Sequence, residues 1–338
     1  MATIKDIARL SGYSIGTVSR VINNHHDVSE QARQTIEKVI AESGFQPNAN
    51  AKHLKQTTSS AITIFVKGTQ NVFLEDILEK IQLQLRNSHE TATVIFLDEA
   101  DNEIEAAKKI ETERRPRGMI FLGGNLDHFR KSFSELKTPS TLVSADASEI
   151  ESSLLSSFAT DDYEGSYAAL ELLIHNGHTK IGIIGGHMSY NEDGITSARL
   201  SGAVDCLKKH DIEFDLEKQF VASRFSMDDG FRAAKRLLKK YPDLTAVFAH
   251  SDMIAIGALR AFTDSGLNVP DDISLIGFDG IEYSRYTIPR IATIRQDTEA
   301  MAKKSIDDLL MRISYQRNGC HEFIPFEVIS KESIRDIR

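Results

Sequence analysis

The chain has 338 residues, 41% of them hydrophobic, and a formal net charge of −9, which is typical of a globular protein of two or three domains. No apolar run reaches about 18 residues, so the sequence excludes a membrane-spanning helix. The amphipathic start, MATIKDIARL, differs from the core of a signal peptide. Cys206 and Cys320 have no metal-ligand spacing, so we expect buried free thiols, a cytoplasmic protein, and no metal or other cofactor.

Charge is unevenly divided along the chain. Residues 1–58 hold seven Lys and Arg against five Asp and Glu, a balance of +2. Because the whole chain carries −9, the remaining residues carry −11. A basic head on an acidic body favours contact with nucleic acid at the head only.

The head is predicted to begin with two short helices joined by a tight turn. The first helix follows Thr3, and its apolar stripe consists of Ile4, Ile7, Ala8 and Leu10. Ser11-Gly12-Tyr13 ends this helix, and Ser14 can cap the second. The apolar face of the second helix consists of Ile15, Val18 and Ile22.

A third helix is predicted from Ser29, its cap, to Ser43-Gly44, with an inward face of Ala32, Ile36, Val39 and Ile40. Three short helices with a glycine turn between the first two are typical of a helix-turn-helix unit. The second helix of such a unit enters the major groove of DNA. A plain three-helix cap with solvated polar faces is the alternative.

The polar face of the second helix has residue types suited to DNA. Gly16 permits close approach, and the hydroxyls of Thr17 and Ser19 can bond to phosphate or bases. Arg20 can donate two hydrogen bonds to guanine O6 and N7.

From about residue 61, apolar strands alternate with amphipathic helices. The helices are expected near 74–87, near 103–114 and between the later strands, and the strands are AITIFV, TATVIFL, GMIFLGG, KIGIIGG, TAVFAHS and ISLIGFDG. This alternation favours parallel, doubly wound sheets covered by helices on both faces. Two such units in tandem suit a bilobed α/β body with a ligand cleft at the strand C-terminal ends.

The motifs of common enzyme classes are absent from the sequence. It contains no G-x-G-x-x-G, no P-loop and no G-x-S-x-G. His175 and His178 have no carboxylate at metal-ligand spacing. We therefore expect a protein that is not an enzyme, with a cytoplasmic sugar or nucleotide enzyme as the alternative.

TIKDIA, TVSRVIN and PNANAKHL follow one another at the spacing of the LacI/GalR family of bacterial transcription regulators, which the chain resembles over nearly its whole length. The resemblance implies that Ile15, Gly16 and Arg20 contact operator bases. It also implies that Thr17 and Ser19 help to hold the phosphate backbone.

The linker QPNANAKHLKQTTSS, taken alone, is a flexible connector with a weak helical tendency. The resemblance implies a hinge helix that forms against its dimer mate, with Leu54 as a wedge between base steps and Lys55 near phosphate. The alternative is that Leu54 packs on its own body.

The resemblance also implies three segments: a helix-turn-helix domain at 1–46, a hinge at 47–60 and an effector-binding and dimerisation body at 61–338. The body is similar to periplasmic sugar-binding proteins. Its chain would cross between the lobes near 161, 290 and 322.

Six residues of the body fall on effector-contacting positions of the family: Phe73, Asp161, Arg199, Phe225, Ser251 and Asp279. Ser251 stands where the family usually has asparagine. Asp162 and Asp252 are expected to be helix caps instead. An interlobe salt bridge is the alternative role for Arg199.

Together these features predict a homodimeric, sequence-specific regulator that binds a near-palindromic operator in double-stranded DNA. By resemblance, we expect a repressor of carbohydrate-utilisation genes controlled by a small sugar-like effector. The alternatives are a nucleoside or phosphorylated effector, and a catabolite regulator with a phosphoprotein corepressor.

Overall fold

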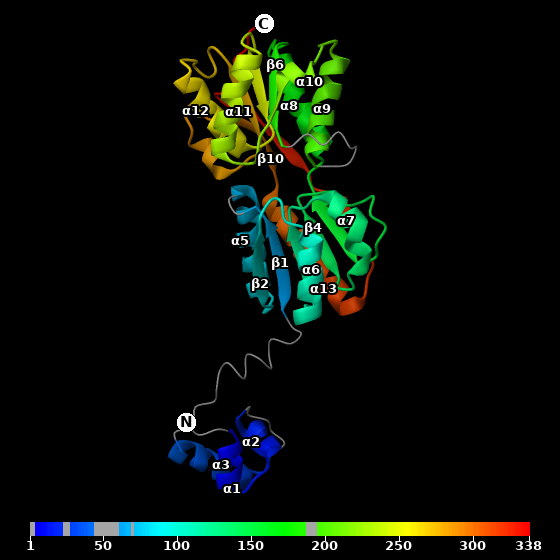
Figure 1. The fold of residues 1–338 in the computed structure, drawn as a ribbon, viewed down its shortest axis with the longest axis vertical. Helices are drawn as coiled ribbons and strands as arrows, with labels where there is room; N and C mark the ends of the chain where they lie inside the picture. Colours follow the sequence, from blue (N-terminus) through cyan, green and yellow to red (C-terminus); the bar gives the residue numbers. More distant parts are fainter. Residues whose placement is uncertain (1–3, 23–27, 44–60, 69–70, 187–194) are drawn as a thin grey trace. The chain divides into compact units, whose positions relative to one another are not determined.

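The computed structural model describes residues 4–22, 28–43, 61–68, 71–186 and 195–338, apart from the side chains of 4–5, 15, 19, 22 and 195–197. The chain divides into two compact units, Met1–Ser60 and Ala61–Arg338 (Figure 1). We call the first unit the head and the second the body.

The head contains three helices, α1 (Ile4–Ser11), α2 (Ile15–Ile22) and α3 (Glu30–Ser43). Their apolar faces meet in a small core of Ile7, Ala8, Val18, Val21 and Ile36. Val39 and Ile40 pack against this core from α3. The predicted helix-turn-helix head is therefore confirmed.

Local signals set the helix ends of the head. Gly12 has φ +74°, a conformation that glycine adopts without steric penalty, and it ends α1 as predicted. The backbone N–H of Thr17 donates to Ser14 Oγ at 3.1 Å, which confirms Ser14 as a cap. One stripe residue was predicted wrongly: Leu10 is 59% exposed. The core side of α1 is centred between Ile7 and Ala8, and Leu10 lies at the edge of that face, where it is left exposed.

The first lobe of the body is a six-stranded parallel sheet in the order β11-β5-β4-β3-β1-β2. Its strands are β1 (Ile62–Lys67), β2 (Ala92–Leu97), β3 (Gly118–Leu122), β4 (Ser140–Val143), β5 (Leu155–Ala159) and β11 (His321–Phe323). The central strands are buried on both faces and therefore read as continuous apolar runs.

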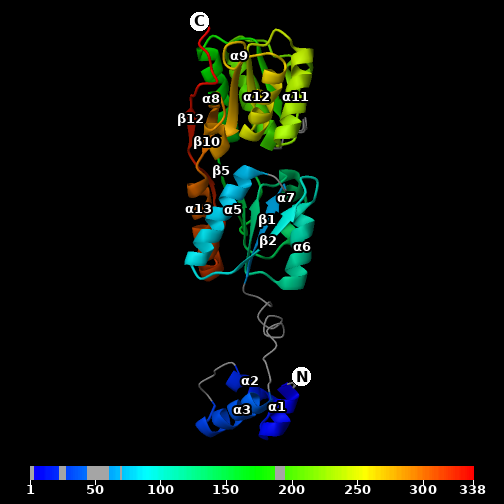
Figure 2. The same ribbon diagram turned by 90° about the vertical axis from the view of Figure 1, so that its left-hand side faces the viewer.

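Helices cover both faces of this sheet (Figure 2). One face packs against α5 (Val72–Asn87) and α13 (Thr298–Tyr315). The other packs against α6 (Glu103–Arg114), α7 (Leu126–Ser132) and the short η1 (Phe133–Glu135).

The second lobe has a second six-stranded sheet in the order β12-β10-β9-β8-β6-β7. Its strands are β6 (Ile181–Gly185), β7 (Phe220–Ala222), β8 (Ala246–Ala249), β9 (Ser274–Asp279), β10 (Ala292–Gln296) and β12 (Phe326–Ile329). All pairs are parallel except β10 with β12, which is antiparallel. Two doubly wound, mainly parallel sheets are thus confirmed.

The helices of the second lobe also lie on both faces of its sheet. One face packs against α8 (Asp162–His175), α9 (Ile195–Lys209) and the short α10 (Leu216–Gln219). The other packs against α11 (Met227–Lys240) and α12 (Asp252–Asp264). A single turn, η2 (Glu282–Arg285), follows β9.

The chain crosses between the lobes three times: between β5 and α8, between β10 and α13, and between β11 and β12. The second crossing follows residue 296 and does not lie near 290. The reason is that β10 pairs with β9 and β12 and so belongs to the second sheet.

Cys206 is buried in the second lobe, whereas Cys320 is exposed. The expectation of two buried thiols is therefore wrong for Cys320, which precedes the edge strand β11. Within the described parts of the chain, no helix has the length and apolarity needed to cross a membrane.

Candidate functional site

The head presents the polar residues of α2 on its surface. Gly16 and Arg20 are exposed, and Thr17 is half-buried. Oγ1 of Thr17 lies 2.9 Å from Oγ of Ser14, so its hydroxyl is held at the first turn of α2. The side chains of Ile15 and Ser19, and the whole of Leu54 and Lys55, lie outside the described residues.

A cleft of about 340 Å³ lies between the two lobes of the body, a volume within the usual range for small-molecule sites. Both lobes contribute to its wall, mostly with residues that follow the C-terminal ends of strands. Four of the six predicted effector residues line it: Phe73, Arg199, Phe225 and Asp279.

Arg199 is the buried cation of the second-lobe wall, at 5% exposure. Its Nε donates to Asp162 Oδ1 at 2.9 Å, and its Nη1 lies 3.5 Å from Asp279 Oδ1. Nη1 also donates to the backbone oxygen of His250. The guanidinium stacks 3.7 Å from the ring centroid of Phe278, so its position is fixed on several sides.

Asp279, at the end of β9, is 7% exposed and accepts a hydrogen bond from Gln296 Nε2 at 2.8 Å. Its φ of +102° is strained for a residue with a side chain. Burial raises the pKa of Asp279 to about 7, although Arg199 and Gln296 act in the opposite direction. The cleft therefore holds a carboxyl group that changes charge near neutral pH.

Replacing Asp279 by asparagine is expected to raise the stability of the body at pH 8 and to flatten its pH dependence. The pKa of an aspartate side chain is about 3.9 in the unfolded chain, whereas that of Asp279 in the fold is raised to about 7. Between these values the folded protein binds more protons, so its stability falls as pH rises through that window. Urea unfolding at pH 5 and pH 8 measures this loss.

The control for this prediction is Asp127→Asn, which changes a more exposed carboxylate of the same cleft. Its unfolding free energy should change with pH as that of the wild type does. The same pH dependence in Asp279→Asn would contradict the argument.

The cap of α8 is Asp161 and not Asp162. Asp161 caps α8 by accepting from the N–H groups of Tyr163 and Glu164, and it is not part of the described cleft wall. Asp162 is the partner of Arg199, and burial raises its pKa while Arg199 lowers it. The prediction of Asp162 as a cap is wrong.

The same one-residue shift occurs at the start of α12. Ser251 is the cap, accepting from the N–H of Ile254 at 3.2 Å, and it lies outside the described cleft wall. Asp252 was wrongly predicted as the cap. It is fully buried and accepts from the N–H of Ile281 at 2.8 Å. Burial and the neighbouring Asp279 raise the pKa of Asp252 well above its usual value.

Comparisons with known proteins give this geometry its context. Residues 3–48 match the family of bacterial regulatory proteins of the lacI type, and residues 170–334 match a periplasmic binding protein-like domain. The regulator MalR of Clostridium butyricum is 34% identical over 340 residues, covering 99% of both chains. The probable repressor ExuR of Bacillus subtilis is 31% identical over 342 residues, again covering 99% of both.

The chain belongs to the LacI family of bacterial regulators. Its fold agrees with a solved structure of that family, the Lac repressor dimer bound to operator and an anti-inducer. The two share 25% identity and a TM-score of 0.74, with 99% of both chains covered. A second structure, the regulator CelR in complex with cellobiose, has a TM-score of 0.70 and 24% identity, and covers 98% of this chain and all of the other.

The LacI-family cleft of this chain also has polar wall residues that the sequence did not single out. On the first lobe they include Lys67, Glu99 and Asn125, and on the second Ser223 and Arg224. Lys67 is the last residue of β1, and the others lie within three residues after the end of β2, β3 or β7. The rule that ligands bind beyond the carboxyl ends of parallel strands could have identified these positions.

Proposed function

We propose that this LacI-family chain is a repressor that binds its operator as a homodimer and is controlled by an uncharged, polyhydroxylated small molecule. One observation carries the proposal: a single chain combines a helix-turn-helix head with a body whose interlobe cleft holds charge-paired polar groups. Hydroxyl groups need hydrogen-bond partners of this kind, and the apolar faces of Phe73 and Phe225 can pack against a sugar ring.

In this proposal, the N-terminal turn of α2 lies in the major groove. Arg20 donates to a guanine, Gly16 lets the backbone approach, and Ile15 contacts a thymine methyl. Thr17 and Ser19 bond to the phosphate backbone. The exposure of Gly16 and Arg20 supports these roles.

The hinge at 47–60 joins this head to the body and couples their states. Leu54 would wedge between base steps of the minor groove, and Lys55 would neutralise a phosphate. Two heads related by two-fold symmetry require a near-palindromic operator. The Lac repressor structure, a dimer on operator DNA, supports this arrangement.

Charge pairing in the cleft favours a neutral effector over a nucleotide or sugar phosphate. Nζ of Lys67 lies 2.5 Å from Glu103, Arg199 contacts two carboxylates, and Arg224 lies 4.0 Å from Glu99. A phosphate recognised here would require cations that are not already paired. A nucleoside is the second candidate class of effector, because it offers hydroxyl groups without a phosphate.

We also propose that the cleft binds its ligand without transforming it. The relatives that match this chain over 99% of its length are named as transcription regulators, which supports recognition of a ligand over its chemical conversion.

The head is tested with an operator selected from random DNA. Arg20→Ala should lower discrimination at one base pair by about 1–3 kcal/mol. Lys55→Ala should instead weaken all sequences alike and reduce the salt slope by about one. Fluorescence anisotropy on operator variants at several salt concentrations measures both. Full operator preference in Arg20→Ala would refute the groove assignment.

A further inference from the structure

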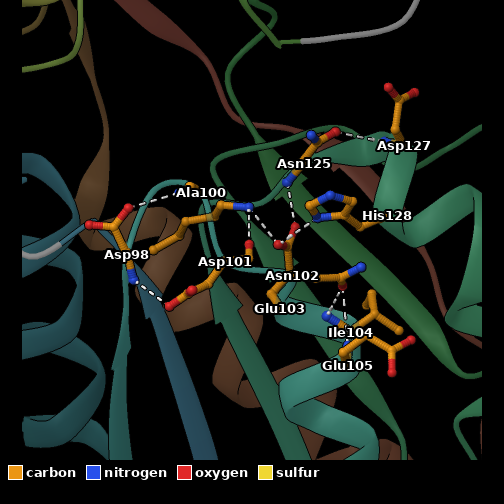
Figure 3. A network of polar contacts seen from close by, with 11 residues as sticks. Asp98, Ala100, Asp101, Asn102, Glu103, Ile104, Glu105, Asn125, Asp127 and His128 are labelled. Atoms are coloured by element: carbon orange, nitrogen blue, oxygen red, sulfur yellow. Dashed lines mark hydrogen bonds and ion pairs between the residues drawn. The ribbon is translucent and has the colours of Figure 1, made fainter.

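A buried carboxylate lies directly behind the first-lobe wall of the cleft. Glu103 is the first residue of α6, after the cap Asn102, and its side chain is 1% exposed. Its Oε2 lies 2.5 Å from Lys67 Nζ and 3.0 Å from His128 Nδ1. Its Oε1 accepts from the backbone N–H of Asn125 at 2.5 Å (Figure 3).

These contacts join three segments that form the cleft wall. Lys67 ends β1, Glu103 follows β2, and Asn125 and His128 follow β3. Lys67 and Asn125 line the cleft, whereas Glu103 lies behind them and is not part of the described wall. Burying a carboxylate is unfavourable unless it is fully paired, so the ammonium and the amide are held where Glu103 requires them.

The pairing leaves Lys67 with a particular chemistry. Its ammonium has three N–H donors. One is directed at Glu103 Oε2 and another at the backbone oxygen of Asp101, at 3.1 Å. Within the described residues, the third has no partner, and Lys67 faces the cleft. Glu103 thus holds the Lys67 ammonium in place and balances its charge, and Lys67 still has one N–H group to donate to a ligand.

We propose that Glu103 is a positioning residue that sets effector selectivity: it fixes Lys67 as a neutralised hydrogen-bond donor, so the cleft accepts a hydroxyl in preference to an anion. This inference deepens the proposed function. Of the measurements below, only those of sugar affinity rest on the proposed function. Without the carboxylate, the ammonium is uncompensated and attracts anions.

The test uses the full chain and the isosteric substitution Glu103→Gln, with inorganic phosphate as the anion. Phosphate affinity, measured by calorimetry and by thermal shift, should rise at least tenfold over the wild type. Affinity for the best neutral sugar from a thermal-shift panel should fall about tenfold. If Glu103 only stabilised the fold, its substitution would lower the affinity for both ligands alike.

Glu105→Gln is the matched control, because Glu105 lies two residues along α6, is 60% exposed and pairs with Lys108. It changes the net charge equally and should bind both ligands as the wild type does. The double variant Lys67→Gln/Glu103→Gln removes both charges, so its phosphate affinity should return to the wild-type value.

Unchanged phosphate affinity in folded Glu103→Gln, or an equal gain in Glu105→Gln or in the double variant, would overturn the proposal. If Glu103→Gln does not fold, the double variant carries the test: it lacks the Lys67 donor, so its affinity for a sugar that the wild type binds should fall about tenfold, and unchanged affinity would overturn the proposal. Phosphate binding is measured without sugar or operator. A failure of the proposed function, in which no sugar binds, is therefore distinguishable from a failure of this inference.

Discussion

Replacing Arg199 by methionine is expected to abolish effector binding and to leave operator binding in place. Methionine fills much of the space of the arginine stem but donates no hydrogen bond, so Asp162 and Asp279 lose their shared cation. Leaving a buried ion-pair partner alone costs about 3–5 kcal/mol. The effector at the same time loses the Arg199 guanidinium as a hydrogen-bond donor. Operator binding should survive in the folded dimer because the proposed DNA contacts are made by the head, a separate compact unit.

Two further variants separate the structural from the binding role of Arg199. Arg224→Met removes a cation of the same cleft that is 56% exposed, so it should reduce effector affinity only modestly and hardly change stability. The double variant Arg199→Met/Asp279→Asn should recover part of the lost stability, because one buried charge is gone, but no effector binding. Calorimetry and thermal unfolding measure the two effects. Wild-type effector affinity in Arg199→Met would eliminate the cleft as the binding site.

Sequence periodicity predicted the head helices and the strands β1, β2, β3, β6, β8 and β9, because continuous apolar runs and amphipathic stripes directly record burial. It did not name β4, β5, β7, β10, β11 or β12, which are short or mix polar with apolar residues. It placed helix caps less well. In the pairs Asp161-Asp162 and Ser251-Asp252, either side chain can cap a helix. Asp161 and Ser251 are the caps because the extended backbone lies at these residues, and the sequence does not indicate which residue of each pair is extended.

Long-range pairing was beyond the sequence. Lys67 and Glu103 are 36 positions apart, and nothing local indicates that two strand ends bring them together. The second lobe crossing was also displaced, because a short segment of mixed polar and apolar residues such as β10 does not reveal which sheet it joins. Thr17 and Arg20 were easier to place, since the positions of an eight-residue helix follow from its apolar face alone.

The second large effect is expected in the head, where Ile36→Ala should unfold the DNA-binding unit and leave the body folded. Ile36 is fully buried at the centre of a core of five residues. Truncating a buried isoleucine to alanine costs about 2–5 kcal/mol. A unit of this size rarely gains more than about 3–5 kcal/mol from its core, so the loss is comparable to its whole stability.

Thr35→Ala is the matched control, because Thr35 is the preceding residue of α3, is also β-branched and is exposed. It should keep operator affinity and head structure. Amide exchange resolved by residue measures the head and the body in one experiment, and effector binding provides a second readout of the body. In Ile36→Ala, protection should vanish in α1, α2 and α3 while the two sheets of the body keep theirs. Loss of protection in both units would mean that they unfold as one, and the separation of DNA binding from effector binding would then be wrong.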